Sequence, residues 1–212
     1  MSTDPHFDLT EPVVWPSMAR SLHGEGEHWS LTACLDWSRG EWYTRIRGFR
    51  QAAELIAAHI AEQRHDQDGL TFPFVYNWRQ HLELALKQLI VEAEWLCGIT
   101  EKPPFGHNLE QLWLRCRTSL ERVGGSDAEL DNVGAAIAEL HAMDPYGDAF
   151  RYPIGADGSA TLPGISRLSF DRVNAALVAV SNFLEAAETA VSVDLENKLE
   201  SEAEMASEYR DC

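Results

Sequence analysis

Apolar residues recur at helical spacing through the middle of the chain, between Pro73 and Gly98. The repeat is seven residues, and the intermediate turns are apolar as well, which puts one continuous hydrophobic face on a helix. A proline suits the first helical position and a glycine the position just past the end. The pattern therefore predicts a core helix over residues 74–97. Its apolar face is made by Val75, Trp78, Leu82, Ala85, Leu89 and Leu96.

The same periodicity predicts further helices on both sides of this one. They run over residues 41–63, from Asn108 to Gly124, from Ser126 to Asp144, and from Ser169 toward Val193. Residues 29–35 alternate between apolar and polar, which is typical of a short strand or an extended segment. Residues 148–163 carry turn signals around Ala156-Asp157-Gly158, which favour a small hairpin or an ordered loop.

We therefore expect an all-α fold, a bundle of four or five main helices with a small extended or β-hairpin insertion near 148–163. An N-terminal arm of irregular or extended segments spans residues 1–39, and the bundle spans 40–193. Residues 194–212 form an acidic tail that we expect to be a frayed extension, solvated, or ordered by a partner.

The net charge of the chain bears on which classes of ligand it can bind. The 212 residues include 34 acidic and 17 basic side chains, a formal net charge of -17. Such a chain is not suited to capturing nucleic acid nonspecifically, because that binding depends on Lys and Arg displacing counterions. A local basic patch stays possible, since residues 185–212 alone hold nine acids against two bases.

Neither a cofactor nor a metal site is predicted. The four cysteines are scattered without a C-x-x-C spacing, which fits a reduced, cytoplasmic protein. His23, Glu25, Glu27 and His28 are potential ligands, but one short loop with two glycines is poorly organised for binding. No run of 18 consecutive apolar residues occurs, so we expect no membrane span.

The polar side of the central helix carries Arg79, Glu83 and Lys87, spaced four apart so that their charges alternate along one line. His81 lies about 200° round the helix from Arg79, so these two cannot meet on one helix. The line of charges is either a solvated face with i,i+4 pairs or the floor of a polar groove. Arg45, Arg47 and Arg50 form a basic cluster, which either balances the acidic remainder or contacts a phosphate or carboxylate.

Three segments carry a resemblance to a known family: YNWRQHLELALKQLI, GHNLEQLW and DPYGDAFRYPIGADG. Together they resemble HEPN-type (higher eukaryotes and prokaryotes nucleotide-binding) helical domains of bacterial type, over roughly residues 72–190. The frame of that family's helix is met by Tyr76, Arg79, His81 and Lys87. The following turn is met by His107 and Leu109, and Phe150 to Pro153 is similar to a segment of bacterial HEPN-like proteins.

The resemblance implies action on RNA or a nucleotide, in stress response or anti-phage defence. Ribonuclease members of that superfamily carry Arg and His four to six residues apart and cut RNA without metal, across a dimer. Here Arg79 and His81 have one intervening residue, and no Arg in the chain is followed by a His at the spacing of that motif. The candidate catalytic residues are Arg79, His81 and His107, and the candidate binding residues are Lys87, Arg115, Arg151 and Tyr152.

Two functions therefore stay open at the level of sequence. One is a HEPN-like protein that acts on or senses RNA or a nucleotide, with a homodimer possible. The other is a noncatalytic acidic interaction module of a regulatory, immunity or antitoxin-like kind, which holds a protein partner through the tail and the aromatic N-terminal region.

Overall fold

The computed structural model describes residues 29–36, 42–99, 102–125 and 127–208. The chain divides into two compact units between Arg39 and Gly40. In the described part of the first unit, Trp29–Leu31 form a single 3-10 turn, η1, and no strand. The alternation of Trp29, Leu31 and Leu35 is therefore not that of a strand, and all three side chains are exposed. The potential metal ligands between His23 and His28 lie outside the described residues.

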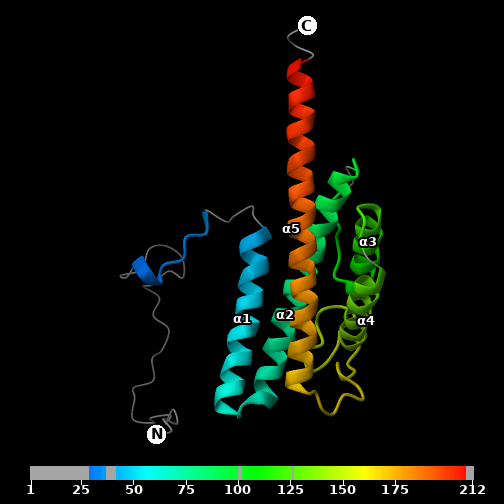
Figure 1. Ribbon diagram of the computed structural model, residues 1–212. Helices are drawn as coiled ribbons and strands as arrows, with labels where there is room; N and C mark the ends of the chain where they lie inside the picture. The colour runs from blue at the N-terminus through cyan, green and yellow to red at the C-terminus, as the bar shows by residue number, and fades with distance from the viewer. Residues whose placement is uncertain (1–28, 37–41, 100–101, 126, 209–212) are drawn as a thin grey trace. The chain divides into compact units, whose positions relative to one another are not determined.

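The second unit is an all-α bundle, as expected (Figure 1). Its central helix is α2, which contacts α1, α3 and α5, while α4 packs against α3 and α5. A single hydrophobic core runs along α2 and includes Phe74, Trp78 and Leu82. The helices are α1 (Trp42–Gln63), α2 (Gln67–Leu96), α3 (Leu109–Arg122), α4 (Asp127–Met143) and α5 (Phe170–Glu208).

Helix α2 begins six residues before the proline that was expected to start it. A proline interrupts only the hydrogen bond that its own nitrogen would have made, and its ring crowds the preceding turn. The first turn of α2 lies before this point and is closed by the backbone nitrogens of Gly69 and Leu70, which donate to the Asp66 oxygen at 3.1 and 2.9 Å. The helix continues through Pro73 to Leu96, and the carbonyl of Pro73 accepts from the Asn77 side chain at 2.7 Å.

Helix α5 is continuous for 39 residues, so the tail up to Glu208 is helical rather than frayed. Its last turns run beyond the end of α2 (Figure 1). The segment LENKLESEAEMASE is acidic but rich in strong helix formers, and propensity outweighs charge repulsion there. Lys198 Nζ also donates to the Leu96 oxygen at 2.9 Å, which fixes α5 to the end of α2.

Over an 18-residue window, α5 is also long and apolar enough to cross a membrane, by length and composition alone. Its residues Leu177, Val180 and Leu184 are buried in the core of the bundle. Of the apolar window as a whole, 28% is buried inside the protein.

Of the two forms expected near 148–163, a hairpin or an ordered loop, the segment forms a loop and not a hairpin. This segment consists of turns and one isolated antiparallel bridge between Ile154 and Ala160. The flanking bonds are Gly155 N to Ser159 O at 2.9 Å and Thr161 N to Pro153 O at 3.4 Å. Pro153 has no N–H to donate in return, so the ladder does not extend.

Candidate functional site

The line of charges on α2 is buried rather than solvated. Arg79, Glu83 and Lys87 are 0, 2 and 8% exposed, so their i,i+4 ion pairs lie inside the protein. The side chains of α2 on this side are covered by the loop before α3 and by the segment after α4. We call Arg79, Glu83, Lys87, Asp144 and His107 the ionic network. The ionic network is therefore neither a solvated face nor the floor of an open groove.

Arg79 is the centre of this network. Its Nη1 lies 3.0 Å from Glu83 Oε2, and its Nη2 donates to the backbone oxygen of His107 at 2.5 Å. Its Nε donates to the backbone oxygen of Asp144 at 3.3 Å. One guanidinium therefore joins α2 to the loop before α3 and to the end of α4, and its donors are directed at protein groups.

Asp144 is the second anionic partner of Arg79, after Glu83. Its Oδ2 lies 3.2 Å from Arg79 Nε, close enough for an ion pair but not aligned as a hydrogen bond. Its Oδ1 accepts from the backbone nitrogens of Asp148 and Ala149 at 2.9 and 3.0 Å. The carboxylate therefore orders the turn that follows α4. Gly147 in this turn has φ +81°, and a Cβ there would lie 2.7 Å from Arg79 Nη1, so the backbone closes directly over the guanidinium.

Glu83 links the network to the surface. It accepts from Lys87 Nζ at 2.7 Å and lies 2.9 Å from His107 Nδ1. Burial alone would raise the pKa of Glu83, but the hydrogen bonds and charges of Lys87 and His107 outweigh burial and lower it. The His107 side chain is 67% exposed, so a buried carboxylate orients an imidazole that faces solvent.

Exposed rings lie on the two loops that Arg79 contacts. Phe105 and Tyr146 are 86 and 77% exposed and lie on the two loops that Arg79 holds. Arg151 stacks over the rings of Tyr152 and Tyr76, with its Cζ at 5.1 and 5.7 Å from their centroids. We call the exposed residues on these two loops the ring surface. It comprises Phe105, His107, Tyr146, Arg151 and Tyr152.

Arg115 is part of a separate pair farther along α2. Its Nε and Nη2 each lie 2.7 Å from an oxygen of Glu94, a two-bond contact between α3 and the end of α2. Arg115 Nη2 also donates to the Lys102 oxygen at 3.4 Å. The guanidinium is thus bound to Glu94, and it does not share a groove with Arg79 and Lys87.

His81 lies on the opposite side of α2, as its angle from Arg79 requires. Its Nδ1 is 2.9 Å from the Ile46 oxygen, and its Nε2 is 2.7 Å from Ser181 Oγ. Burial lowers the pKa of His81, against the opposing effect of the hydrogen bond to Ile46. His81 therefore joins α1, α2 and α5 as a neutral side chain. The structure does not bring it to Arg79 or to His107.

An open groove of about 590 Å³ lies beside His81, between α1, α2 and α5. Its basic side chain Arg50 is bound to Glu54 at 2.7 Å and to Glu185 and Asn182 at 2.9 Å each. Within the arginine cluster on α1, Arg50 is thus paired with acidic residues. Arg47 donates to the Tyr43 hydroxyl at 3.0 Å.

Sequence reasoning missed Asp144 and Ser181. Asp144 was interpreted only as a helix stop before Pro145, and its signal was its place at the start of DPYGDAFRYPIGADG. Ser181 gave no signal, because a serine in a helix has no distinguishing neighbours in the sequence.

The chain matches no protein-family model, no curated protein and no solved structure. The arrangement itself offers one exposed imidazole held by a carboxylate, one stacked arginine and several exposed rings. Arg79, His81 and His107 do not form an Arg–His pair in which both side chains could contact the same substrate.

Proposed function

We propose that this chain is a HEPN-like binding protein that recognises RNA or a nucleotide through the ring surface. The observation that carries the proposal is that two loops, both held by Arg79, present rings and a stacked arginine to solvent. Unpaired bases stack on exposed aromatic rings and on guanidinium planes, and each such contact is worth about 1–3 kcal/mol.

Binding is favoured over cleavage by the state of the predicted catalytic residues. Arg79 is 0% exposed, and its donors are directed at Glu83, Asp144 and His107, so it does not face a phosphate. His81 is buried with both ring nitrogens engaged. His107 is the exposed member of the three, and it supplies a contact to the ligand in this proposal.

Arg151 is the cation of the ring surface, and the chain as a whole is acidic. The ligand should therefore be short and single-stranded, because a long duplex would bring many phosphates toward a protein of net charge -17. With few phosphate contacts, affinity should fall only shallowly with salt.

The test is fluorescence anisotropy with short single-stranded RNA of mixed sequence and with free nucleotides. Tyr152→Ala should weaken binding roughly tenfold by removing one stacking partner. Tyr43→Ala is the matched control, since Tyr43 is an equally exposed tyrosine (58 against 55%) on α1. Absence of binding by the unmodified chain, or equal losses in both variants, would refute the proposal.

A parallel assay in EDTA separates binding from cleavage. The same RNA pool is incubated with the unmodified chain, with His81→Ala and with His107→Ala. Intact RNA in all three reactions is expected. Metal-independent cutting that His107→Ala abolishes would instead establish a ribonuclease built on the Glu83–His107 pair.

A second candidate function is favoured by the last turns of α5. Beyond Lys198, this helix exposes Leu199 and Met205 (52 and 51%) among Glu200, Glu202 and Glu204. An acidic helix with exposed apolar residues suits a basic protein partner. Binding of a Lys- and Leu-rich helical peptide should weaken in Glu200→Ala/Glu204→Ala, whereas Glu139→Ala on α4 should not change it. Equal binding by all three proteins would exclude this use of α5.

The proposal also covers where the protein is located in the cell and whether it forms a homodimer. We propose a cytoplasmic protein, and light scattering of the purified chain distinguishes the proposed homodimer from a monomer.

A further inference from the structure

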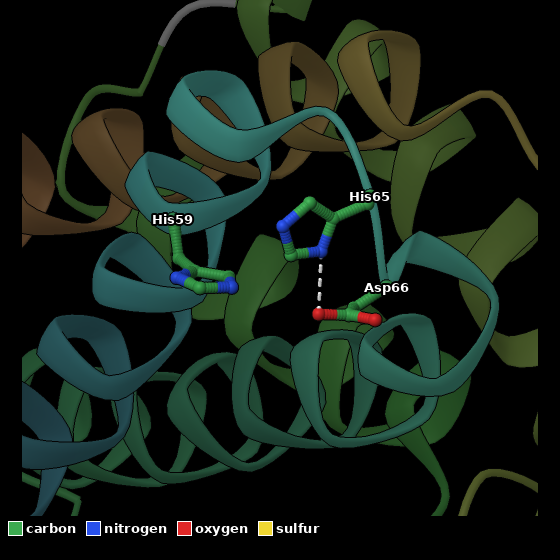
Figure 2. Close-up of side chains that lie close together, drawn as sticks. All are labelled: His59, His65 and Asp66. Carbon is green, nitrogen blue, oxygen red and sulfur yellow. Dashed lines mark hydrogen bonds and ion pairs between the residues drawn. The ribbon is translucent and has the colours of Figure 1, made fainter. Parts of the chain in front are cut away.

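Three side chains that can bind a metal ion lie close together where α1 ends and the connection to α2 begins. His59 lies in the last turns of α1, and His65 and Asp66 lie in the connection itself (Figure 2). One potential ligand atom from each residue lies within 4.8 Å of the other two, and all three residues are exposed. They line a shallow depression of about 640 Å³ together with Arg64 and Asp68.

The backbone is shaped to bring His65 back toward α1. Arg64 and Asp66, on either side of it, have φ of 56° and 64° and are the two non-glycine residues with positive φ in the described part of the chain. This conformation costs about 1 kcal/mol or more per residue. The result is an edge-to-face contact of His65 with His59, with ring centroids 6.0 Å apart.

Asp66 gives an independent indication. It occupies the N-cap position of α2, where an aspartate ordinarily accepts a backbone N–H of the first turn, a contact worth about 1 kcal/mol. Here its side chain makes no capping bond. Its Oδ2 instead lies 2.6 Å from His65 Nδ1, and Figure 2 shows this carboxylate below the two imidazoles.

We propose that His59, His65 and Asp66 bind a divalent transition-metal ion of the zinc class. Two imidazoles and one carboxylate are a donor set that zinc accepts, with water in the remaining position. Calcium and magnesium are not suited to the site because they require mostly oxygen ligands. Asp68 adds negative charge to the depression, and Arg64 opposes it in part.

The geometry needs only side-chain adjustment. At metal–ligand bonds of about 2.1 Å, donor atoms in a tetrahedral site lie roughly 3.4 Å apart. The widest pair must therefore close from at most 4.8 Å, and the His65–Asp66 pair must open from 2.6 Å. Exposed side chains can do both by rotation, and the ion reaches them directly from solvent.

The test uses the full chain freed of metal by EDTA and then dialysed. Visible absorption of added Co²⁺, followed by displacement with Zn²⁺, reports the number of ions and their affinity. We expect a site of micromolar affinity or tighter that His59→Ala and His65→Ala each weaken at least tenfold. Glu62→Gln is the matched control, because Glu62 is an exposed carboxylate in the same last turn of α1. Millimolar binding, or binding unchanged in both histidine variants, overturns the proposal.

Two further measurements separate this site from other ligands in the chain. His23→Ala/His28→Ala should keep the high-affinity site, and loss of the site in that variant would move it to the N-terminal segment. Zn²⁺ should also raise the Tm of the unmodified chain, because an ion held jointly by α1 and by the connection before α2 binds the folded state more tightly than the unfolded one. The same ion should raise the Tm of His65→Ala by less, and an equal rise in both proteins would contradict the proposal.

Discussion

The two sides of α2 bury ionisable groups by opposite means. On one side, Arg79, Glu83 and Lys87 each lie against a partner of opposite charge. On the other side, His81 is buried as a neutral ring whose two nitrogens meet a carbonyl and a hydroxyl. A buried charge needs compensating charges, whereas a buried neutral ring needs only hydrogen-bond partners.

The difference shows in what each side holds together. The His81 contacts join helices that already pack through apolar residues. The Arg79 contacts join α2 to two loops, and those loops carry the ring surface. The ion pairs on one side of α2 thus position the loops of the candidate site, whereas the neutral His81 on the other side connects helices of the bundle.

Removing the centre of the charged side should have the largest effect. Arg79→Met keeps the volume of the side chain but leaves Glu83 and Asp144 buried without Arg79. We expect a loss of about 3–5 kcal/mol in the free energy of unfolding, measured by urea denaturation. Arg79→Met combined with Glu83→Gln should lose less than the sum of the two single variants. A single-variant loss below about 1 kcal/mol would show that the network is not needed for stability.

Gly147→Ala should have the next largest effect. A Cβ at this position would lie 2.7 Å from Arg79 Nη1, and the residue has φ +81°. Strain in the left-handed region and overpacking together should cost about 2–3 kcal/mol. Gly158→Ala is the matched control, because it has φ +82° with nothing within 4 Å of the added Cβ. The difference in Tm between the two variants isolates the contact with Arg79, and equal Tm values would mean that the contact is not tight.

The two sides of α2 should also contribute to the free energy of unfolding over different pH ranges. Burial lowers the pKa of His81 below 6.5, so the unfolded chain binds a proton that the folded chain resists. This contribution is fully present above pH 6.5 and is lost as the pH falls below it. The pKa of Glu83 is lowered from 4.5, so its contribution is present above pH 4.5 and is lost as the pH falls toward the folded value.

Urea denaturation at stepped pH measures both contributions. His81→Gln should flatten the curve just below pH 6.5 and leave the fall below pH 4.5, whereas Glu83→Gln should do the reverse. A curve for the unmodified chain that is flat between pH 7 and 5 would contradict the account of His81.

His107→Ala should have the smallest effect on stability. Its side chain is 67% exposed, and Glu83 keeps Lys87 and Arg79 as partners when the imidazole is removed. We expect a loss within about 1 kcal/mol, measured in the same urea experiments. A loss comparable to that of Arg79→Met would place His107 inside the network rather than at its edge.

The helices could be predicted from sequence because apolar periodicity and capping residues are local signals. Asn108 accepts from the Gln111 nitrogen at 2.9 Å, as the capping box predicts. The start of α2 was missed because proline chemistry alone suggested a boundary. The helical end of α5 was missed because acidity was given more weight than propensity.

The site was predicted less well, for a physical reason. The i,i+4 spacing places Arg79, Glu83 and Lys87 on one line, but spacing does not reveal what covers that line. Burial came from Asp144 and from the carbonyl of His107, which lie 65 and 28 residues away from Arg79 in sequence. Long-range contacts of this kind leave no periodic signal.

The ionic network also has a consequence for how the sequence can vary. Replacing Arg79, Glu83 or Asp144 alone leaves an uncompensated charge in the interior, whereas replacing several of them together with apolar residues of similar volume can be neutral. Positions 79, 83 and 144 are therefore constrained as a set rather than one by one. Among descendants of this chain, we expect substitutions at these positions to occur together, and a charge lost at one of them to be followed by a loss at another.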